Sequence, residues 1–414
     1  MPHRLLKFAL SKKHPEPRMF RAPTELKSEY DAVIIGGGGH GLAAAYYLAK
    51  DHGISNVAVL EKGYIGGGGT GRNTAIIRAN YLTPDGVRFY QSSVEMFQDL
   101  SRELNFNLFY SARGHFTLAH SPASLRTQRW RAEVNKHLGI NSRVVAPEFI
   151  KETVPEIDLR VGGHQAPIYG ALYHPPGAVA RHDAVAWGYA RGADRRGVEI
   201  HQQTAVTDIE LHDGTVVGVH TDRGFIKTRK VLSAVAGWTT HITAMVGLRT
   251  PLVIHPLQAM VTEPLKPWLD SIVVSAALHL YLSQSSRGEL VAGAALDPYE
   301  LISMRSTLDF AEGMSTGLLD LFPCLGDIKV LRQWAGLCDM TPDFSPIMGI
   351  TPIKGFYIDA GWGTWGFKAT PISGKTMAFT VAENRDHELI EAYSLSRFKR
   401  LELVGEKGAA SVGH

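Results

Sequence analysis

The sequence predicts an α/β protein in which a parallel sheet is combined with a second, mainly antiparallel sheet. Three observations point to this fold class. Residues 31–61 contain a strand, a glycine turn, a helix and a second strand, which together form the smallest unit of a parallel sheet. Residues 250–300 consist of longer alternating segments with a hairpin turn at 285–288, a pattern typical of antiparallel sheets. Residues 355–384 repeat the order of strand, glycine turn and helix.

The first unit is built from apolar runs and small residues. Residues 31–35 and 56–61 have the length and composition of buried parallel strands. The helix expected at 40–50 carries three consecutive alanines, so it can pack closely on a sheet. A second glycine cluster at 66–69 opens a long loop, and we expect a helix that begins within residues 70–78 and carries Arg78.

Apolar periodicity predicts the remaining elements. We expect helices at 85–104, 122–138, 147–153 and 303–320, a helix from Asp183 to Arg196 with Asp183 as its cap, strands at 114–119, 230–238, 328–334 and 355–360, a hairpin meander around 212–225, and a helix at 370–384. The aromatic residues on the helix at 85–104 recur at helical spacing, so we assign them to the core.

Composition excludes several classes of protein. The chain has 414 residues with 43 Lys and Arg against 40 Asp and Glu, and this balance argues against nucleic acid as a partner. Cys324 and Cys338 are too few for a disulfide framework, and the histidines form no metal-binding motif. No apolar run has the length of a membrane span, and the first residues lack a secretory signal. We therefore expect a cytoplasmic protein without a metal site or membrane partner.

A dinucleotide-binding fingerprint follows the first strand. Gly36-x-Gly38-x-x-Gly41 precedes the helix, and Glu61 ends the next strand 20 residues after the last glycine. Glycines allow a pyrophosphate to approach the backbone, the helix N-terminus offers free N–H groups, and the acid accepts from ribose hydroxyls. Further glycine clusters at 66–71 and 361–366 favour a flavin over a nicotinamide, because the longer flavin needs additional contacts.

Two cations and one histidine stand out beside these glycines. The turn at 361–368 places backbone N–H groups and Lys368 at a helix start, where they can stabilise negative charge on a reduced flavin. Arg78 can face a pyrophosphate or a substrate carboxylate. His182 lies between Arg181 and Asp183 at a predicted helix start, which favours a neutral imidazole, although a helix cap is the simpler interpretation of this position.

From Tyr30 to its end the chain resembles the beta subunits of heterotetrameric sarcosine oxidases, which belong to the D-amino-acid-oxidase superfamily of flavin enzymes. The resemblance is carried by Ile-Ile-Gly-Gly-Gly-Gly-His-Gly-Leu-Ala-Ala-Ala-Tyr-Tyr-Leu-Ala (34–49), Val-Ala-Val-Leu-Glu-Lys-Gly (57–63), Arg-Asn-Thr-Ala-Ile-Ile-Arg-Ala-Asn-Tyr (72–81), Arg-His-Asp-Ala-Val-Ala-Trp (181–187), His-Pro-Leu-Gln-Ala (255–259) and Gly-Trp-Gly-Thr-Trp-Gly-Phe-Lys-Ala-Thr-Pro (361–371). Trp365 departs from this family's turn, in which a small residue is expected.

The resemblance implies a glutathione-reductase-like FAD-binding domain and a second, mainly antiparallel substrate domain. The expected division is an irregular arm at 1–29, an FAD-binding domain at 30–115, 170–240 and 325–400, a substrate and interface domain at 116–169 and 241–324, and a C-terminal tail at 401–414.

The resemblance also implies a reaction. Non-covalent FAD oxidises the N-methyl group of sarcosine, electrons pass to an FMN held covalently by His182, and molecular oxygen becomes hydrogen peroxide. The products are glycine and formaldehyde or methylenetetrahydrofolate. The implied partners are alpha, gamma and delta subunits, and NAD and tetrahydrofolate bind mostly on a partner subunit.

The residues expected to act follow from these motifs. Arg78 and Lys368 are the catalytic candidates, because they can hold the substrate carboxylate or activate oxygen. We expect FAD contacts from Gly36, Gly38, Gly39, His40, Gly41, Glu61, Lys62, Gly69, Thr70, Arg72, Asn73, Thr74, Val206, Gly363, Gly366 and Lys368. Arg332 is a weaker candidate for contact with FMN.

Two other functions remain open from the sequence. A single-flavin amino-acid dehydrogenase or glycine-oxidase-like enzyme would leave His182 unmodified and would act without partner subunits. A flavin-binding subunit without a substrate site of its own would tolerate changes at Arg78 and Lys368.

Overall fold

The computed structural model describes residues 25–160 and 167–406, together with residues 3, 6, 9–11 and 20–23. Parts of the arm expected at 1–29 and residues 407–414 of the expected tail lie outside these residues. Within the arm, Arg21 forms an ion pair with Asp194 at 2.9 Å. No helix in the described ranges is long and apolar enough to cross a membrane.

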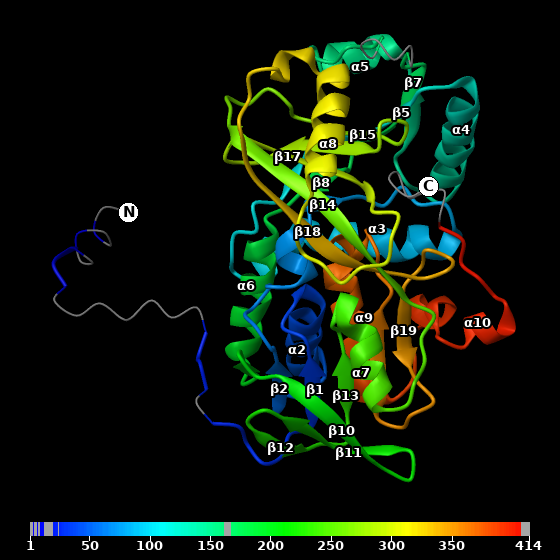
Figure 1. The fold of residues 1–414 in the computed structure, drawn as a ribbon. Coiled ribbons are helices and arrows are strands. Elements are labelled where there is room, and N and C mark those ends of the chain that lie inside the picture. Colours follow the sequence, from blue (N-terminus) through cyan, green and yellow to red (C-terminus); the bar gives the residue numbers. More distant parts are fainter. Residues whose placement is uncertain are drawn as a thin grey trace.

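A six-stranded, mostly parallel sheet forms the lower layer in Figure 1. Its order is β19 (Ile347–Ile350), β20 (Phe356–Ala360), β13 (Val231–Ser233), β1 (Ala32–Ile35), β2 (Val57–Leu60) and β9 (Glu199–His201), and only β19 runs antiparallel to its neighbour. The predicted strands at 31–35, 56–61 and 355–360 are confirmed. The strand expected at 230–238 is shorter, because a 3-10 turn, η2 (Ala236–Trp238), follows β13.

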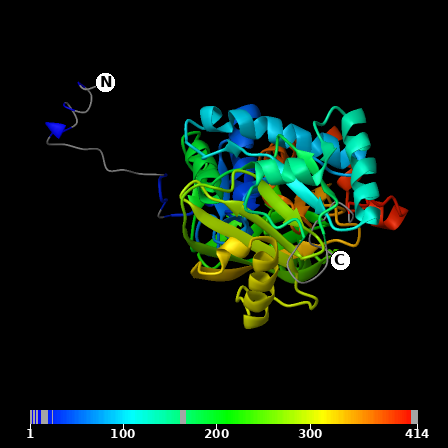
Figure 2. The same cartoon turned by 90° about the horizontal axis from the view of Figure 1, so that it is seen from above.

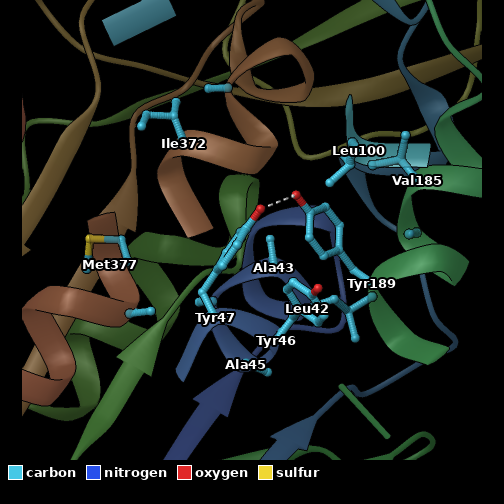
Figure 3. Close-up of a cluster of buried hydrophobic side chains, with 14 of the residues drawn as sticks. Leu42, Ala43, Ala45, Tyr46, Tyr47, Leu100, Val185, Tyr189, Ile372 and Met377 are labelled. Carbon is cyan, nitrogen blue, oxygen red and sulfur yellow. Dashed lines mark hydrogen bonds between the residues drawn. The ribbon is translucent and has the colours of Figure 1, made fainter. Parts of the chain in front are cut away.

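Four helices cover one face of this sheet. They are α2 (Gly39–Asp51), α3 (Pro84–Glu103), α6 (His182–Asp194) and α9 (Gly366–Glu383). Alternate strand residues such as Ile34 and Val59 join their core, in which Tyr47 and Tyr189 face each other from α2 and α6 (Figure 3). The alanines of α2 permit close packing on α9: a Cβ on Gly374 would lie 2.3 Å from the Cβ of Ala43.

The other face of the parallel sheet is covered by a small antiparallel sheet and a short helix. The small sheet is the predicted meander of β10 (Val206–His212), β11 (Thr215–Thr221) and β12 (Gly224–Lys227), and the helix is α7 (Thr239–Met245). Val33 and Ala58, which alternate with the residues facing the helices, pack on this side.

An eight-stranded sheet forms the upper layer in Figure 1. Its order is β18 (Val330–Met340), β14 (Val253–Pro264), β17 (Glu289–Leu296), β16 (Leu280–Gln284), β15 (Ile272–Ser275), β5 (His115–Ala119), β7 (Gly170–His174) and β6 (Arg143–Val145). All neighbours are antiparallel except β15 and β5. Helices α8 (Leu308–Leu321) and α5 (Pro147–Thr153) share a core with one face.

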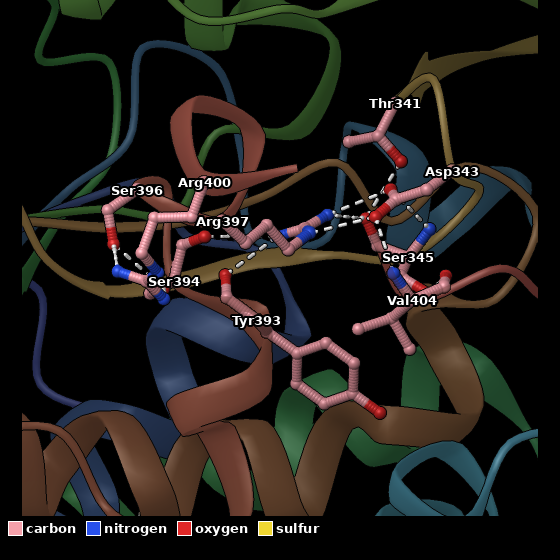
Figure 4. Close-up of polar contacts among 9 residues, drawn as sticks. All are labelled: Thr341, Asp343, Ser345, Tyr393, Ser394, Ser396, Arg397, Arg400 and Val404. Atoms are coloured by element: carbon pink, nitrogen blue, oxygen red, sulfur yellow. Dashed lines mark hydrogen bonds and ion pairs between the residues drawn. The ribbon is translucent and has the colours of Figure 1, made fainter. Parts of the chain in front are cut away.

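The remaining elements complete the layers. They are α4 (Pro122–His137), α10 (Arg397–Arg400), the 3-10 turns η1 (Gly69–Arg72), η3 (Pro323–Leu325) and η4 (Glu388–Tyr393), and a three-stranded sheet of β3 (Ile76–Ile77), β8 (Ala178–Val179) and β4 (Ser111–Ala112). Seen from above in Figure 2, α4 and the red C-terminal segment lie at the same end of the molecule. There Arg397 and Asp343 form a buried ion pair (Figure 4).

The strand order of the two sheets can be compared with the expected division of the chain into domains. Strand β7 lies within the range 170–240 and β18 within the range 325–400, yet both pair in the eight-stranded sheet. Residues 401–406, expected as tail, end in Glu406, which is 1% exposed. We propose that the substrate domain extends to include β7 and β18.

Two sequence predictions about helix starts are wrong. Arg78 follows strand β3 and lies on no helix, because residues 76–77 pair with 178–179 instead of coiling. Helix α6 begins at His182 after Arg181 as its N-cap residue and ends at Asp194, so Asp183 lies inside the first turn. Asp183 accepts from Arg181 and from the N–H of Ala184.

Candidate active site

A cavity of about 620 Å³ lies between the carboxyl ends of the parallel strands and the eight-stranded sheet. Ile35 of β1, Leu60 of β2 and Ala234 after β13 line one side, whereas Ala259, Val274 and Tyr281 of the second sheet line the other. This is the position at which open α/β sheets bind their ligands.

The fingerprint glycines shape one end of the cavity. Gly36 has a φ of +111°, and a Cβ there would lie 2.3 Å from the carbonyl oxygen of Ala234. Helix α2 starts after Gly38 without a side-chain cap from this residue, and the N–H of its first residue, Gly39, donates to Thr70; the partial positive charge of the helix N-terminus still favours an anion. Gly36, Gly38 and Gly39 line the cavity, whereas Gly41 does not: a Cβ on Gly41 would meet the oxygen of Gly36 at 2.1 Å. Gly41 therefore lets the helix pack on the turn.

Glu61 occupies the position expected for a ribose ligand. Its carboxylate accepts from the N–H groups of Gly37 and Gly63, each at 2.8 Å, and the side chain lines the cavity. These two bonds fix the carboxylate at the end of β2, and they leave lone pairs that can accept from hydroxyl groups.

A second group of predicted residues comes from the loop after β2. Thr70 accepts from the N–H of Gly39 at 2.9 Å and so joins turn η1 to the start of α2. The ammonium of Lys62 lies 3.1 Å from the ring centroid of Trp238. Gly69, Arg72, Asn73 and Thr74 of this loop also line the cavity, and so does Val206 at the start of β10.

The glycine turn at the start of α9 forms the centre of the cavity wall. Gly361 and Gly363 have φ values of +72° and +49°, which glycine adopts without strain. Asp339 accepts from the N–H of Gly361 at 2.6 Å, and burial raises the pKa of this carboxyl group to about 6. Gly363, Gly366 and Lys368 line the cavity, and Trp365 packs edge-on against Tyr81 with centroids 5.2 Å apart.

His40 connects the two helix starts. Its Nδ1 lies 3.0 Å from a carboxylate oxygen of Asp359, and its Nε2 lies 2.7 Å from the carbonyl oxygen of Gly366. Burial alone would lower the pKa of His40, but Asp359 and the carbonyl raise it above its usual value. The imidazole thus joins the pyrophosphate end of the cavity to the turn at α9.

Two buried cations lie at the other end. Arg78 is 5% exposed and donates to Oδ1 of Asn80 at 2.8 Å, and Lys368 is 7% exposed. Burial and the charge of Arg78 hold the pKa of Lys368 well below its usual range. Buried cations near each other in a cavity favour an anionic ligand, because its charge offsets their desolvation and repulsion.

Some predicted residues lie away from this cavity. His182 stands at the first turn of α6, and Arg332 is exposed on β18 at the edge of the sheet; neither lines the cavity. The Nδ1 atom of His182 has no hydrogen-bond partner in the described part of the chain, and burial lowers the pKa of this imidazole. The carboxylate of Asp183 accepts hydrogen bonds from Nε and Nη2 of Arg181.

Sequence reasoning missed several cavity residues, among them His115, Tyr281, Cys338 and Asp339. All four come from the eight-stranded sheet, which turns one face to the cavity. The signal available was the alternation of the strands, which separates core-facing Phe116 and Leu118 from His115. Across the described ranges, no group of His, Cys, Asp or Glu side chains is arranged to hold a metal ion.

Comparison with known proteins identifies the family. A model described as DAO, FAD dependent oxidoreductase, matches residues 31–380. Sarcosine oxidase beta subunits from Rhodobacter capsulatus and Rhizobium meliloti are 43% and 44% identical to the chain, over 95% and 92% of its length and 94% and 91% of theirs. The chain belongs to the sarcosine oxidase beta-subunit family. It is accordingly an FAD-dependent amino-acid oxidoreductase.

The solved structure of an L-proline dehydrogenase from P. horikoshii confirms the fold class. It superposes with a TM-score of 0.85 and 29% identity, covering 92% of this chain and 100% of that one. The cavity fits the FAD of the sarcosine oxidase beta-subunit family, because the N-terminus of α2, Glu61 and the glycine turn at α9 suit its pyrophosphate, ribose and ring.

Proposed function

We propose that this protein oxidises sarcosine to glycine as the beta subunit of a hetero-oligomer, with non-covalent FAD in the cavity. The observation that carries the proposal is the pair Arg78 and Lys368, two buried cations beside the glycine turn at α9. Sarcosine is a small zwitterion, so these cations bind its carboxylate and place its N-methyl group against the turn. FAD supplies the chemistry of two-electron removal from the C–N bond when it is bound.

The surroundings of the pair support a substrate of this size. Val274, Ala259 and Tyr281 line the cavity on the side of the eight-stranded sheet, and both cations are themselves buried. Removal of two electrons and one proton, the equivalent of a hydride, from the N-methyl group leaves an iminium ion. Water then adds to its carbon and the C–N bond breaks, which yields glycine and formaldehyde; transfer of that carbon to tetrahydrofolate yields methylenetetrahydrofolate.

The second flavin belongs to the proposal as well. His182 is the position to which the family resemblance assigns covalent FMN, and its unpartnered Nδ1 and lowered pKa fit an unprotonated nitrogen that can form a bond. Electrons would leave by this flavin to oxygen, giving hydrogen peroxide, and Arg332 is the weaker candidate for a contact with FMN. Partners of the alpha, gamma and delta type, NAD and tetrahydrofolate on a partner subunit, and a cytoplasmic location complete the proposal.

In-gel flavin fluorescence of the denatured polypeptide, co-expressed with its partner subunits, tests the two-flavin assignment. We expect a fluorescent band and the mass of FMN on the peptide that contains His182, and neither with the variant His182→Ala. Release of all flavin as FAD would instead favour the single-flavin amino-acid dehydrogenase. Turnover of sarcosine by Arg78→Met or Lys368→Met at the native rate would favour a subunit without a substrate site.

A further inference from the structure

His115 is a buried histidine that lines the cavity without an assigned role. It is the first residue of β5 and is 1% exposed. Its neighbour Phe116 points into the core beneath α8, so His115 belongs to the opposite face of the sheet, together with Tyr281 and Val274. A Cβ on Gly177 would lie 2.5 Å from the Cβ of His115, so the backbone around Gly177 fixes the base of this side chain.

His174, next to His115 in this sheet, has the hydrogen bonds of a histidine with a structural role. His174 of β7 is the direct cross-strand partner of His115. Its Nδ1 lies 2.9 Å from the carbonyl oxygen of Asn141, and its Nε2 accepts from the N–H of Ala79 at 3.3 Å. In contrast, Nδ1 of His115 has no hydrogen-bond partner in the described ranges. A buried polar atom without a partner is unusual, so the ring of His115 lacks the hydrogen bonds that fix the ring of His174, while its side chain still lines the cavity.

The groups around His115 keep its ring neutral. Burial, and then the charges of Arg78, His174, Arg131 and Lys368 in that order, lower the pKa of His115 well below its usual value. These groups come from the segment after β3, from α4, from α9 and from β7. A neutral imidazole has one nitrogen that accepts a hydrogen bond.

We propose that His115 accepts a hydrogen bond from the substrate amine while Arg78 and Lys368 bind the carboxylate. This inference rests on the proposed oxidation of an N-methyl amino acid. A secondary amine has one N–H bond and one lone pair, so binding the N–H fixes the direction of the lone pair relative to the N-methyl group. A tertiary amine lacks the N–H, so it leaves the buried imidazole without a hydrogen-bond partner. A site that hydrogen-bonds a substrate N–H discriminates strongly against such an amine.

The substrate test compares sarcosine with N,N-dimethylglycine. We expect kcat/KM to favour sarcosine by roughly 100-fold or more in the native protein, and His115→Leu to bring the ratio near unity. The variant His115→Gln keeps a hydrogen-bond acceptor on a side chain of similar reach and should restore part of the preference. An unchanged ratio in an FAD-loaded His115→Leu protein would overturn the proposal.

A binding test does not depend on turnover. Pyrrole-2-carboxylate and furan-2-carboxylate have similar shape and charge, but only the pyrrole carries an N–H, and both are titrated against the flavin absorbance of the FAD-loaded complex. We expect the native protein to bind the pyrrole roughly 10- to 100-fold more tightly. His115→Leu should bind both equally, whereas His174→Asn, which loses the bond to Ala79, should weaken both without changing their ratio.

The outcomes separate this inference from the proposed function. The protein could fail to oxidise sarcosine and still prefer pyrrole-2-carboxylate over furan-2-carboxylate in a way that depends on His115. That result would refute the proposed substrate and support the amine contact. Equal binding of pyrrole and furan by the native protein, or tighter binding of furan, refutes the amine contact even when His115→Leu does not fold.

Discussion

The guanidinium of Arg131 donates hydrogen bonds to the main-chain oxygen of Asn80. The side chain of the same residue, Asn80, accepts a hydrogen bond from Arg78. The Nε atom of Arg131 lies 2.7 Å from the main-chain oxygen, and its Nη2 donates to the same atom. Asn135, one turn further along α4, donates to the oxygen of Tyr81 at 2.8 Å. Glu406 accepts from the N–H groups of Leu82 and Thr83. Buried side chains therefore hold the irregular segment that carries Arg78.

Replacing Arg131 should disturb the substrate site from outside the cavity. Arg131→Met leaves the buried oxygen of Asn80 with only the long bond from Nη1 of Arg78 at 3.4 Å, which costs about 1–3 kcal/mol of stability. Because Asn80 also orients Arg78, we expect KM for sarcosine to rise roughly 10-fold or more with a smaller change in kcat. Thermal denaturation and steady-state kinetics measure the two effects. Arg126→Met, on the exposed side of α4, is the matched control and should change neither.

Deprotonation of Lys368 should weaken the binding of an anionic ligand as the pH rises. A carboxylate binds the ammonium form, so binding is strongest below the lowered pKa of Lys368 and weakens as the pH rises through it. Lys368→Arg keeps its charge to higher pH, so the alkaline weakening should disappear. Titration of pyrrole-2-carboxylate against flavin absorbance at increasing pH measures this. Lys375→Arg on the same helix is the control; an identical pH profile for Lys368→Arg would contradict the assignment.

The parts of the site that are local in sequence could be predicted, and those that depend on distant pairing could not. The glycine turn, α2 and Glu61 form one unit of about 30 residues, so the local sequence predicts a nucleotide-binding unit there. Arg78 was placed on a helix because β3 has only two residues, too few to show alternation, and its partner β8 lies about 100 residues away.

His115 illustrates the second limit. It and His174 are both strand histidines in a chain with 18 histidines, and they differ only in what surrounds each ring. The bonds of His174 come from residues 79, 141 and 142, and the cavity beside His115 is lined by segments spread between residues 35 and 368. No local pattern encodes either environment. The pairing of β7 and β18 in the eight-stranded sheet was not predicted either, because pairing partners are not visible in a single sequence.

Two helix glycines should respond in opposite ways to the same substitution. Gly374 of α9 is buried, and an added Cβ would lie 2.3 Å from the Cβ of Ala43, so Gly374→Ala overpacks the contact and should cost about 1–3 kcal/mol. Gly313 of α8 is exposed with no atom within 4 Å of an added Cβ, so Gly313→Ala should stabilise by up to about 1 kcal/mol. Chemical denaturation of both variants checks this, and two changes of the same sign would contradict the packing argument.

The buried ion pair between Arg397 and Asp343 in Figure 4 should stabilise the C-terminal segment, and the size of this stabilisation should depend on pH. Arg397 donates Nε and Nη2 to the carboxylate of Asp343 at 2.8 and 2.9 Å, and Val404 donates its N–H to the same group at 3.1 Å. Arg397→Met leaves a buried carboxylate without its cation, which should cost about 3–5 kcal/mol.

Burial alone would raise the pKa of Asp343, but the bonds and charge of Arg397 lower it below 3.8. The stabilisation from this pair is therefore fully present above pH 3.8, and it is lost as the pH falls through the lowered pKa of the folded state. Denaturation curves should show a larger difference between native protein and Arg397→Met at neutral pH, where Asp343 is charged in both, than at low pH, where it is protonated in both. The double variant Arg397→Met with Asp343→Leu should lose less stability than Arg397→Met alone, because no unpaired charge stays buried; a greater loss would show that the bonds of Asp343 to the main chain matter more than its pairing with Arg397.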